Sequence, residues 1–76
     1  MKEIDLGKSV YELTEMYPEL IPLLKEQGFL GVVNPIARNT LGRVTTIPEG
    51  CQKQGKNLQI VIEVLKKAGF DVTEGG

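Results

Sequence analysis

Both arginines of this chain fall in one glycine-rich stretch at its middle, Gly28–Val44. A guanidinium group suits phosphate, sulfate or carboxylate, because its N–H donors form a planar fork. Asn34 precedes a proline, a pair typical of a helix start, where free backbone N–H groups and the helix dipole favour an anion. We therefore predict a site for an anionic ligand at Gly31, Asn34, Arg38 and Arg43.

A structural role is the alternative for the two arginines. Arg38 would then be solvated, and Arg43 would pair with a nearby carboxylate. The two residues are five positions apart, so on a continuous helix they would not share a face. We expect Gly42 to end the helix, which would let Arg43 fold back toward the site.

Cys51, the only cysteine, is the second candidate for chemistry. A reactive or persulfide-carrying thiol needs partial exposure and a positive environment. The sequence instead puts Cys51 on one helix face with Ile47, and free cysteine is among the most buried residue types. We predict that Cys51 fills the core, with a sulfur carrier or thiol redox protein as the alternative.

The composition excludes several kinds of catalytic and metal-binding site. The chain has no histidine and one cysteine, so no Ser–His–Asp or Cys–His arrangement and no zinc site of four Cys/His ligands can form. The carboxylates offer no sharp pair. We expect no catalytic residue, no metal site and no cofactor.

Charge and hydropathy bear on partners and location. The net charge is −1 and the pI about 5.3, which disfavours nucleic acid. The stretch Gly28–Gly31 matches the G-x-x-G loop of KH domains only formally, because its inner residues are apolar. No apolar run approaches the roughly 20 residues that span a bilayer, and Met1–Asp5 lacks the apolar run of a signal peptide. We expect no nucleic-acid or membrane partner and a cytoplasmic location.

Helix signals dominate the rest of the sequence. Seventy-six residues allow a single domain, 1–76. Capping boxes begin at Ser9 and Thr46, asparagines precede two further helices, and glycines follow the helix ends. We predict an all-α fold, a compact array of about five short helices at residues 10–17, 21–27, 35–41, 47–54 and 58–68. Two short segments, Lys2–Leu6 and Arg43–Thr46, are candidates for a minimal two-strand bridge.

The segments "YPELIPLLKEQGF" and "NPIARNTLGRVTTI" resemble the family called domain of unknown function 1858. The likeness runs from about Ser9 to Leu65, and it extends to a stand-alone streptococcal member. Its most specific parts are Tyr17-Pro18-Glu19, Ile21-Pro22, Gly28-Phe29, Asn34-Pro35 and Thr40-Leu41-Gly42-Arg43. The resemblance implies a small multihelical fold.

More distant relatives suggest where function resides. Domains associated with the hybrid iron–sulfur cluster protein, and the N-terminal domain of di-iron repair proteins, carry cysteines just after the Gly-Phe turn. Here the matching residues, about Gly31–Asn34, are Gly, Val, Val and Asn. The redox chemistry implied for those relatives cannot transfer to this chain without a thiol there, which favours binding over catalysis.

These observations favour a small non-catalytic binding or accessory domain. It would use the Gly28–Arg43 surface for an anionic ligand, or for a partner protein in iron, redox or nitrosative handling, a partner class that only the resemblance implies. The alternative is a homo-oligomerisation or docking module with Leu30, Val32 and Val33 as an exposed apolar patch.

Overall fold

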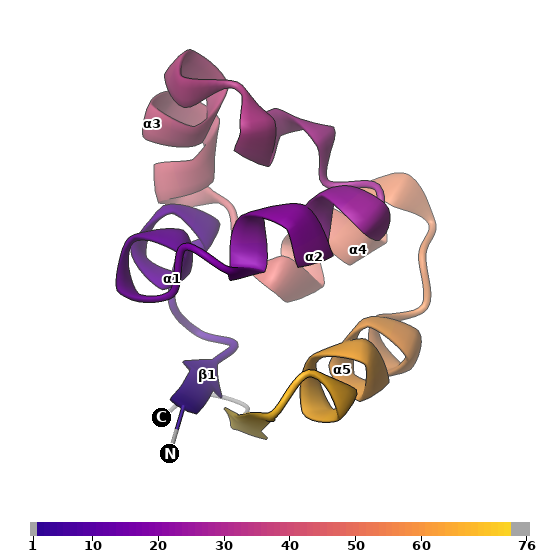
Figure 1. The fold of residues 1–76 in the computed structure, drawn as a ribbon. Helices are drawn as coiled ribbons and strands as arrows, with labels where there is room; N and C mark the ends of the chain where they lie inside the picture. The colour runs from indigo at the N-terminus through magenta and orange to yellow at the C-terminus, as the bar shows by residue number, and fades with distance from the viewer. Residues whose placement is uncertain (1, 74–76) are drawn as a thin grey trace.

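The computed structural model describes residues 2–73, with Leu30 described by its backbone alone. Within these residues the chain forms five α-helices, one short 3-10 helix and two strands (Figure 1). This confirms the all-α class with a minimal two-strand element. The α-helices are α1 (Val10–Met16), α2 (Leu20–Glu26), α3 (Pro35–Val44), α4 (Ile47–Gln54) and α5 (Leu58–Lys67). The 3-10 helix η1 is Leu30–Val33, and the strands are β1 (Lys2–Asp5) and β2 (Phe70–Thr73).

The two strands pair in parallel, from Lys2 opposite Phe70 to Asp5 opposite Thr73. The prediction for the second strand was wrong, because Arg43–Thr46 is not the partner of β1. Its first two residues end α3, and Thr46 forms only an isolated antiparallel bridge with Ser9. Burial of Phe70 decides the pairing, since its ring packs edge-on against Tyr17 in the core.

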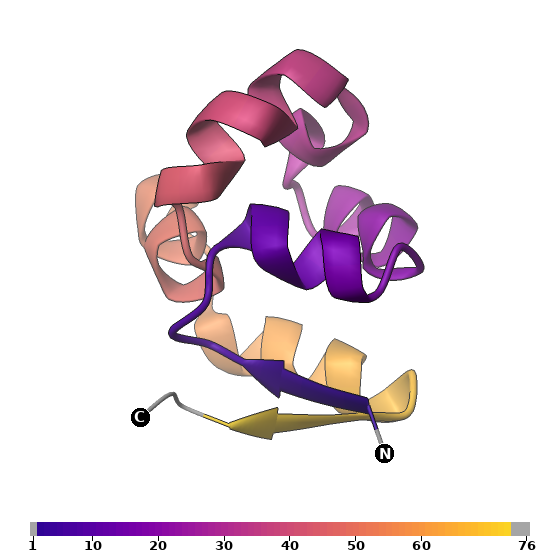
Figure 2. The same cartoon turned by 90° about the vertical axis from the view of Figure 1, so that its left-hand side faces the viewer.

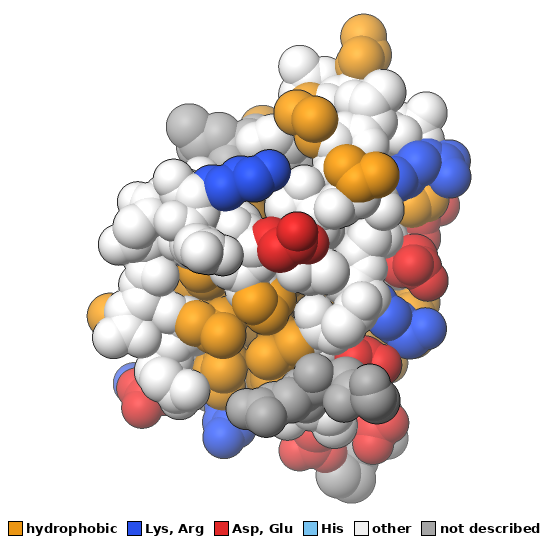
Figure 3. Space-filling view, turned by 180° about the vertical axis from the view of Figure 1, so that it is seen from behind, with side chains coloured by type: hydrophobic (Ala, Val, Ile, Leu, Met, Phe, Trp, Pro, Cys, Tyr) orange, Lys and Arg blue, Asp and Glu red, His pale blue; other side chains and the backbone are white. Residues whose placement is uncertain are grey.

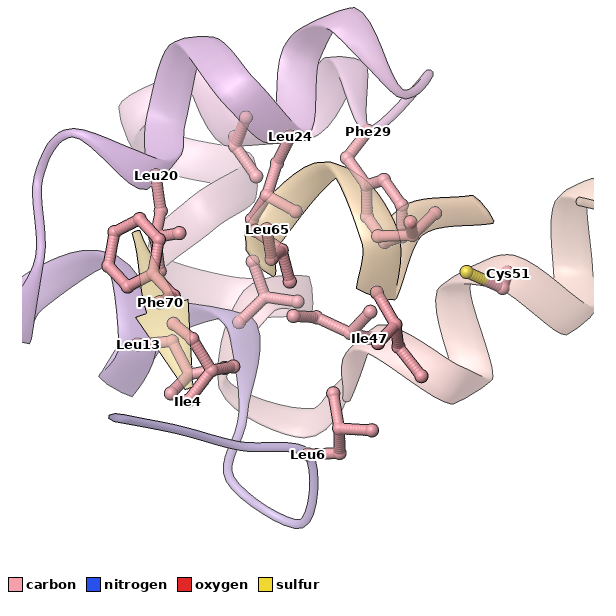
Figure 4. Close-up of a cluster of buried hydrophobic side chains, with 14 residues drawn as sticks. Ile4, Leu6, Leu13, Leu20, Leu24, Phe29, Ile47, Cys51, Leu65 and Phe70 are labelled. Carbon is pink, nitrogen blue, oxygen red and sulfur yellow. The ribbon is translucent and has the colours of Figure 1, made fainter. Parts of the chain in front are cut away.

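The molecule has three levels, seen best from the side (Figure 2). The strands and α5 lie at one end, while α3 and η1 lie at the other. Between them lie α1 and α2, which contribute Val10, Leu13, Leu20 and Leu24 to the core, a cluster of 14 buried apolar residues (Figure 4). The segment Gly28–Val44 therefore forms one end of the domain and is held to the rest through α1 and α2.

Local signals place the helix starts as predicted. Thr46 and Glu49 form a complete capping box, with each side chain accepting the other residue's backbone N–H. At α1 only half of the box forms: the Ser9 hydroxyl accepts the Glu12 N–H at 3.1 Å, but the Glu12 carboxylate lies 3.4 Å from the Ser9 hydroxyl instead. The helix begins at the predicted residue in both cases.

Glycines end three of the helices. Gly28, Gly55 and Gly69 have φ values of +93°, +69° and +98°, in the left-handed region that favours glycine. After Gly28, the Phe29 N–H donates to the Leu24 carbonyl at 2.9 Å and turns the ring back onto the core. The predicted helix ends at these glycines are confirmed.

Gly42 does not end its helix, so that prediction was wrong. Helix α3 continues through Gly42 to Val44. Gly42 is the one buried residue of α3, and a Cβ on it would lie 3.6 Å from both the backbone nitrogen and the Cβ of Tyr11 in α1. These are ordinary contact distances, so a side chain would fit here. Glycine costs only about 1 kcal/mol in a helix interior, and the contacts of α3 with α1 can extend the helix past this residue.

Candidate functional site

A cavity of about 380 Å³ lies between the η1–α3 segment and α4. Its apolar walls come from Val10, Phe29, Val32, Ala37 and Leu41. Its polar and charged lining residues are Arg38, Thr45, Lys53 and Gln54, and four glycines complete it: Gly28, Gly31, Gly42 and Gly50. The predicted Gly28–Arg43 surface thus supplies most of one side, and α4 supplies a side that the sequence did not indicate.

Two of the lining glycines, Gly50 and Gly31, lie next to other lining residues. A Cβ on Gly50 would overlap the Phe29 ring, so the ring packs directly on the backbone of α4. Within the η1–α3 side, a Cβ on Gly31 would meet the Ala37 Cβ at 3.7 Å, an ordinary contact. Glycine at position 50 therefore lets the two sides of the cavity meet at Phe29.

Arg38 lines the cavity but its charge is already balanced. Its Nη1 donates to the Glu15 carboxylate at 3.1 Å and to the Thr14 hydroxyl at 3.0 Å, and its side chain is 20% exposed. Thr14 is buried in α1 and donates to the Val10 carbonyl at 2.9 Å. The interactions with α1 hold Arg38 in place, so it is not the freely solvated residue of the structural alternative.

Arg43 does not line the cavity. Its Nε and Nη2 donate to the Asn39 side-chain oxygen at 3.1 and 2.9 Å, one turn earlier in α3. Its guanidinium carbon lies 4.2 Å from the centre of the Tyr11 ring, and that of Arg38 lies 5.1 Å from the same ring. Both arginines thus make cation–π contacts with one tyrosine. Within residues 2–73, Arg43 forms no ion pair.

Asn34 caps α3 and uses the donors of its first turn. Its side-chain oxygen accepts the Ile36 N–H at 2.9 Å and the Ala37 N–H at 3.3 Å, while its carbonyl accepts the Arg38 N–H. The proline at the first position has no N–H. The backbone donors that the predicted anion site would use are therefore bonded within the chain. Of the four predicted residues, the structure brings Gly31 and Arg38 to the cavity and leaves Asn34 and Arg43 outside it.

Lys53 is the cavity residue whose charge is unbalanced. No lining residue is a carboxylate, and in the described part of the chain Lys53 forms no ion pair. Its nearest acidic neighbour in α4, Glu49, accepts the Thr46 N–H in the capping box. Sequence reasoning missed Lys53, because only the packing of α4 against Phe29 brings it to the site. The rim of the cavity is consequently positive.

Cys51 lies in the core, as predicted. It is 2% exposed, and its thiol points from α4 toward the apolar cluster (Figure 4). Burial raises the pKa of the thiol above its usual value, and Lys56 opposes this shift more weakly. Both effects of burial, on access and on thiolate formation, weigh against a sulfur-carrier role. Within residues 2–73, no group of three or more metal-ligating side chains is gathered.

We expect alkylation of Cys51 in the folded protein to be slow. The reagent reacts with an exposed thiolate, whereas the Cys51 thiol is buried and its pKa is raised. Iodoacetamide at pH 8 should modify the folded protein at least about tenfold more slowly than the urea-unfolded chain. Mass spectrometry of timed samples gives both rates. Equal rates in the two states would show that the thiol is accessible in solution.

The exposed apolar side chains of this region lie on α3. Ile36, Leu41 and Val44 are between 66% and 76% exposed, and hydrophobic groups stand over α3 at the upper right of the back face (Figure 3). The predicted patch was wrong at Val32, which is buried in the core because η1 turns it inward. Val33 is half-exposed, and the side chain of Leu30 lies outside the described residues.

Comparison with known proteins identifies the family of this chain and a similar solved structure. The family model for a domain of unknown function, DUF1858, matches residues 4–62, and the chain belongs to this family. Its structure is similar to the crystal structure of a conserved domain protein from Streptococcus pneumoniae TIGR4, with a TM-score of 0.92 and 30% sequence identity. That similarity covers 96% of this chain and 92% of the other. No curated protein sequence matches the chain.

Among the helices of residues 2–73, none combines the length and the apolar character that crossing a membrane requires.

Proposed function

We propose that this domain is a non-catalytic binding module that takes a small ligand in the cavity between α3 and α4. The cavity itself carries the proposal: about 380 Å³ is within the usual range of ligand sites, which are concave and mostly apolar with a few polar groups. Its walls here are five apolar side chains, and its polar groups stand beside them. The buried Cys51 adds no reactive group to this arrangement.

The positive rim supports the anionic ligand that the sequence predicted, with a different residue set. Arg38 and Lys53 are the charged lining residues, and both are cations. An accessory role in iron, redox or nitrosative handling, and a cytoplasmic location, belong to the proposal as well. The role rests on the resemblance to cysteine-bearing relatives.

Docking is a second candidate, because α3 leaves an apolar face in solvent. Ile36 and Val44 lie outside the cavity, so contact through them would not need a ligand site. Sedimentation of the protein at increasing concentration tests self-association, and Ile36→Glu should abolish it if α3 mediates it.

A cavity-blocking variant tests ligand binding directly. Ala37 lines the cavity, and its neighbour Ile36 points into solvent, so Ala37→Phe and Ile36→Phe form a matched pair. Nitrogen-15 NMR titrations of the wild-type protein with carboxylates, phosphate, nucleotides and aliphatic alcohols should find a compound whose saturable shifts cluster at Gly31, Leu41 and Lys53.

We expect Ala37→Phe to weaken that binding by about tenfold or more, because the phenyl ring occupies the ligand's space. Ile36→Phe should leave it within about twofold of wild type. Equal effects of the two substitutions, or saturable shifts located away from the cavity, would refute the proposal.

A further inference from the structure

We infer that the ligand of this cavity is an aliphatic carboxylate, with its apolar body between α3 and α4 and its carboxylate at Lys53. This inference rests on the proposed function and specifies its ligand class. It follows from three properties of the lining: its apolar inner wall, the sign of the charges, and the exposure of the rim residues.

The walls favour an apolar body. Val10, Phe29 and Val32 are buried core residues whose side chains form the inner wall. In the described residues, every buried side-chain nitrogen or oxygen already has a hydrogen-bond partner. A sugar or a nucleobase would lose hydrogen bonds to water against this inner wall, at a cost that its three apolar side chains do not offset. An alkyl chain loses none and gains by leaving water.

The charges favour a single negative group. Arg38 is held by Glu15 and Thr14, which leaves Lys53 as the lining cation without a partner in residues 2–73. A lysine ammonium is a compact point charge on a flexible stem, and one such group balances one carboxylate. The backbone donors at the start of α3, which would favour a phosphate, are bonded to Asn34. An amine would instead meet the like charge of Lys53.

The rim favours a ligand that enters from solvent along α3. Leu41 belongs to the lining and is 66% exposed, so an alkyl chain in the cavity would cover part of its side chain. Lys53 is exposed on the opposite wall. The arrangement places apolar surface inside and a mobile cation at the edge, which matches the two ends of an aliphatic acid.

Three probes with the same eight-carbon alkyl chain and different head groups test the inference: nonanoate, 1-octanol and octylammonium. Each is titrated below its aggregation threshold into the full chain at low ionic strength, with amide shifts as the readout. We expect nonanoate to bind more tightly than 1-octanol by about threefold, the usual worth of an exposed ion pair, and octylammonium to bind most weakly. The preference should shrink as salt is added.

Lys53→Gln identifies the anchor, and Lys66→Gln, on α5, is its matched control. Lys53→Gln should lower nonanoate affinity by about threefold and leave 1-octanol affinity unchanged, whereas Lys66→Gln should change neither. Both lysines are exposed, so neither variant is expected to unfold the domain.

The outcomes separate the inference from the proposed function. Equal binding of nonanoate and 1-octanol in the cavity, or equal losses from the two lysine variants, would overturn the carboxylate assignment and leave a binding module for neutral ligands. Failure of all three probes while another compound binds the cavity would overturn it as well. A dimer that excludes the probes would show that a second copy of the chain occupies this surface, and would overturn both.

Discussion

Leu24→Ala should lower the free energy of unfolding by about 2–5 kcal/mol, the usual cost of emptying a buried leucine site. Leu24 is fully buried in α2, and its carbonyl also accepts the Phe29 N–H that closes the helix. A domain of this size is marginal, with total stability near the lower end of about 5–15 kcal/mol. We therefore expect the variant to be partly unfolded at 37 °C.

Urea denaturation followed by circular dichroism measures this loss. Leu23→Ala is the matched control, because Leu23 is the next residue of the same helix and is only half-buried at the edge of the core. It should cost less than half as much. A Leu24→Ala variant within about 1 kcal/mol of wild type would mean that the neighbouring side chains collapse into the space, and that the core is looser than described.

The same substitution in two helices should have opposite effects on stability. Gly50→Ala should destabilise the domain by about 1–3 kcal/mol, because its Cβ overlaps the buried Phe29 ring and the ring must move. Gly42→Ala should stabilise it by about 0.5–1 kcal/mol, because the Cβ meets Tyr11 at an ordinary contact distance and alanine favours the helix.

Thermal denaturation of the two variants beside the wild-type protein checks both signs. Gly50→Ala should also weaken the binding of any ligand in the cavity, since Phe29 forms one of its walls. Destabilisation by Gly42→Ala would show that α3 lies closer to α1 than the 3.6 Å contacts indicate.

Local interactions determined the helices from the sequence alone. The Thr46–Glu49 capping box and the Asn34 cap each join groups within four residues, so these interactions do not depend on contacts with distant parts of the chain. Gly28 likewise ends α2 through bonds confined to the same turn. The burial of Cys51 was also predictable, because its position relative to Ile47 on one helix face follows from helical geometry.

Only the tertiary structure decided the remainder of the site and the sheet. Strand β1 pairs with Phe70–Thr73 at the far end of the sequence, a choice made by packing of Phe70 that no local pattern expresses. The sequence predicts a helix end at Gly42, but α3, which packs against α1, continues through it to Val44. Lys53 joins Arg38 at the cavity because α4 packs on Phe29, while Asn34 and Arg43 turn to partners of their own. Contacts between residues distant in the chain depend on how the helices pack together, which the spacing of residues within one helix does not specify.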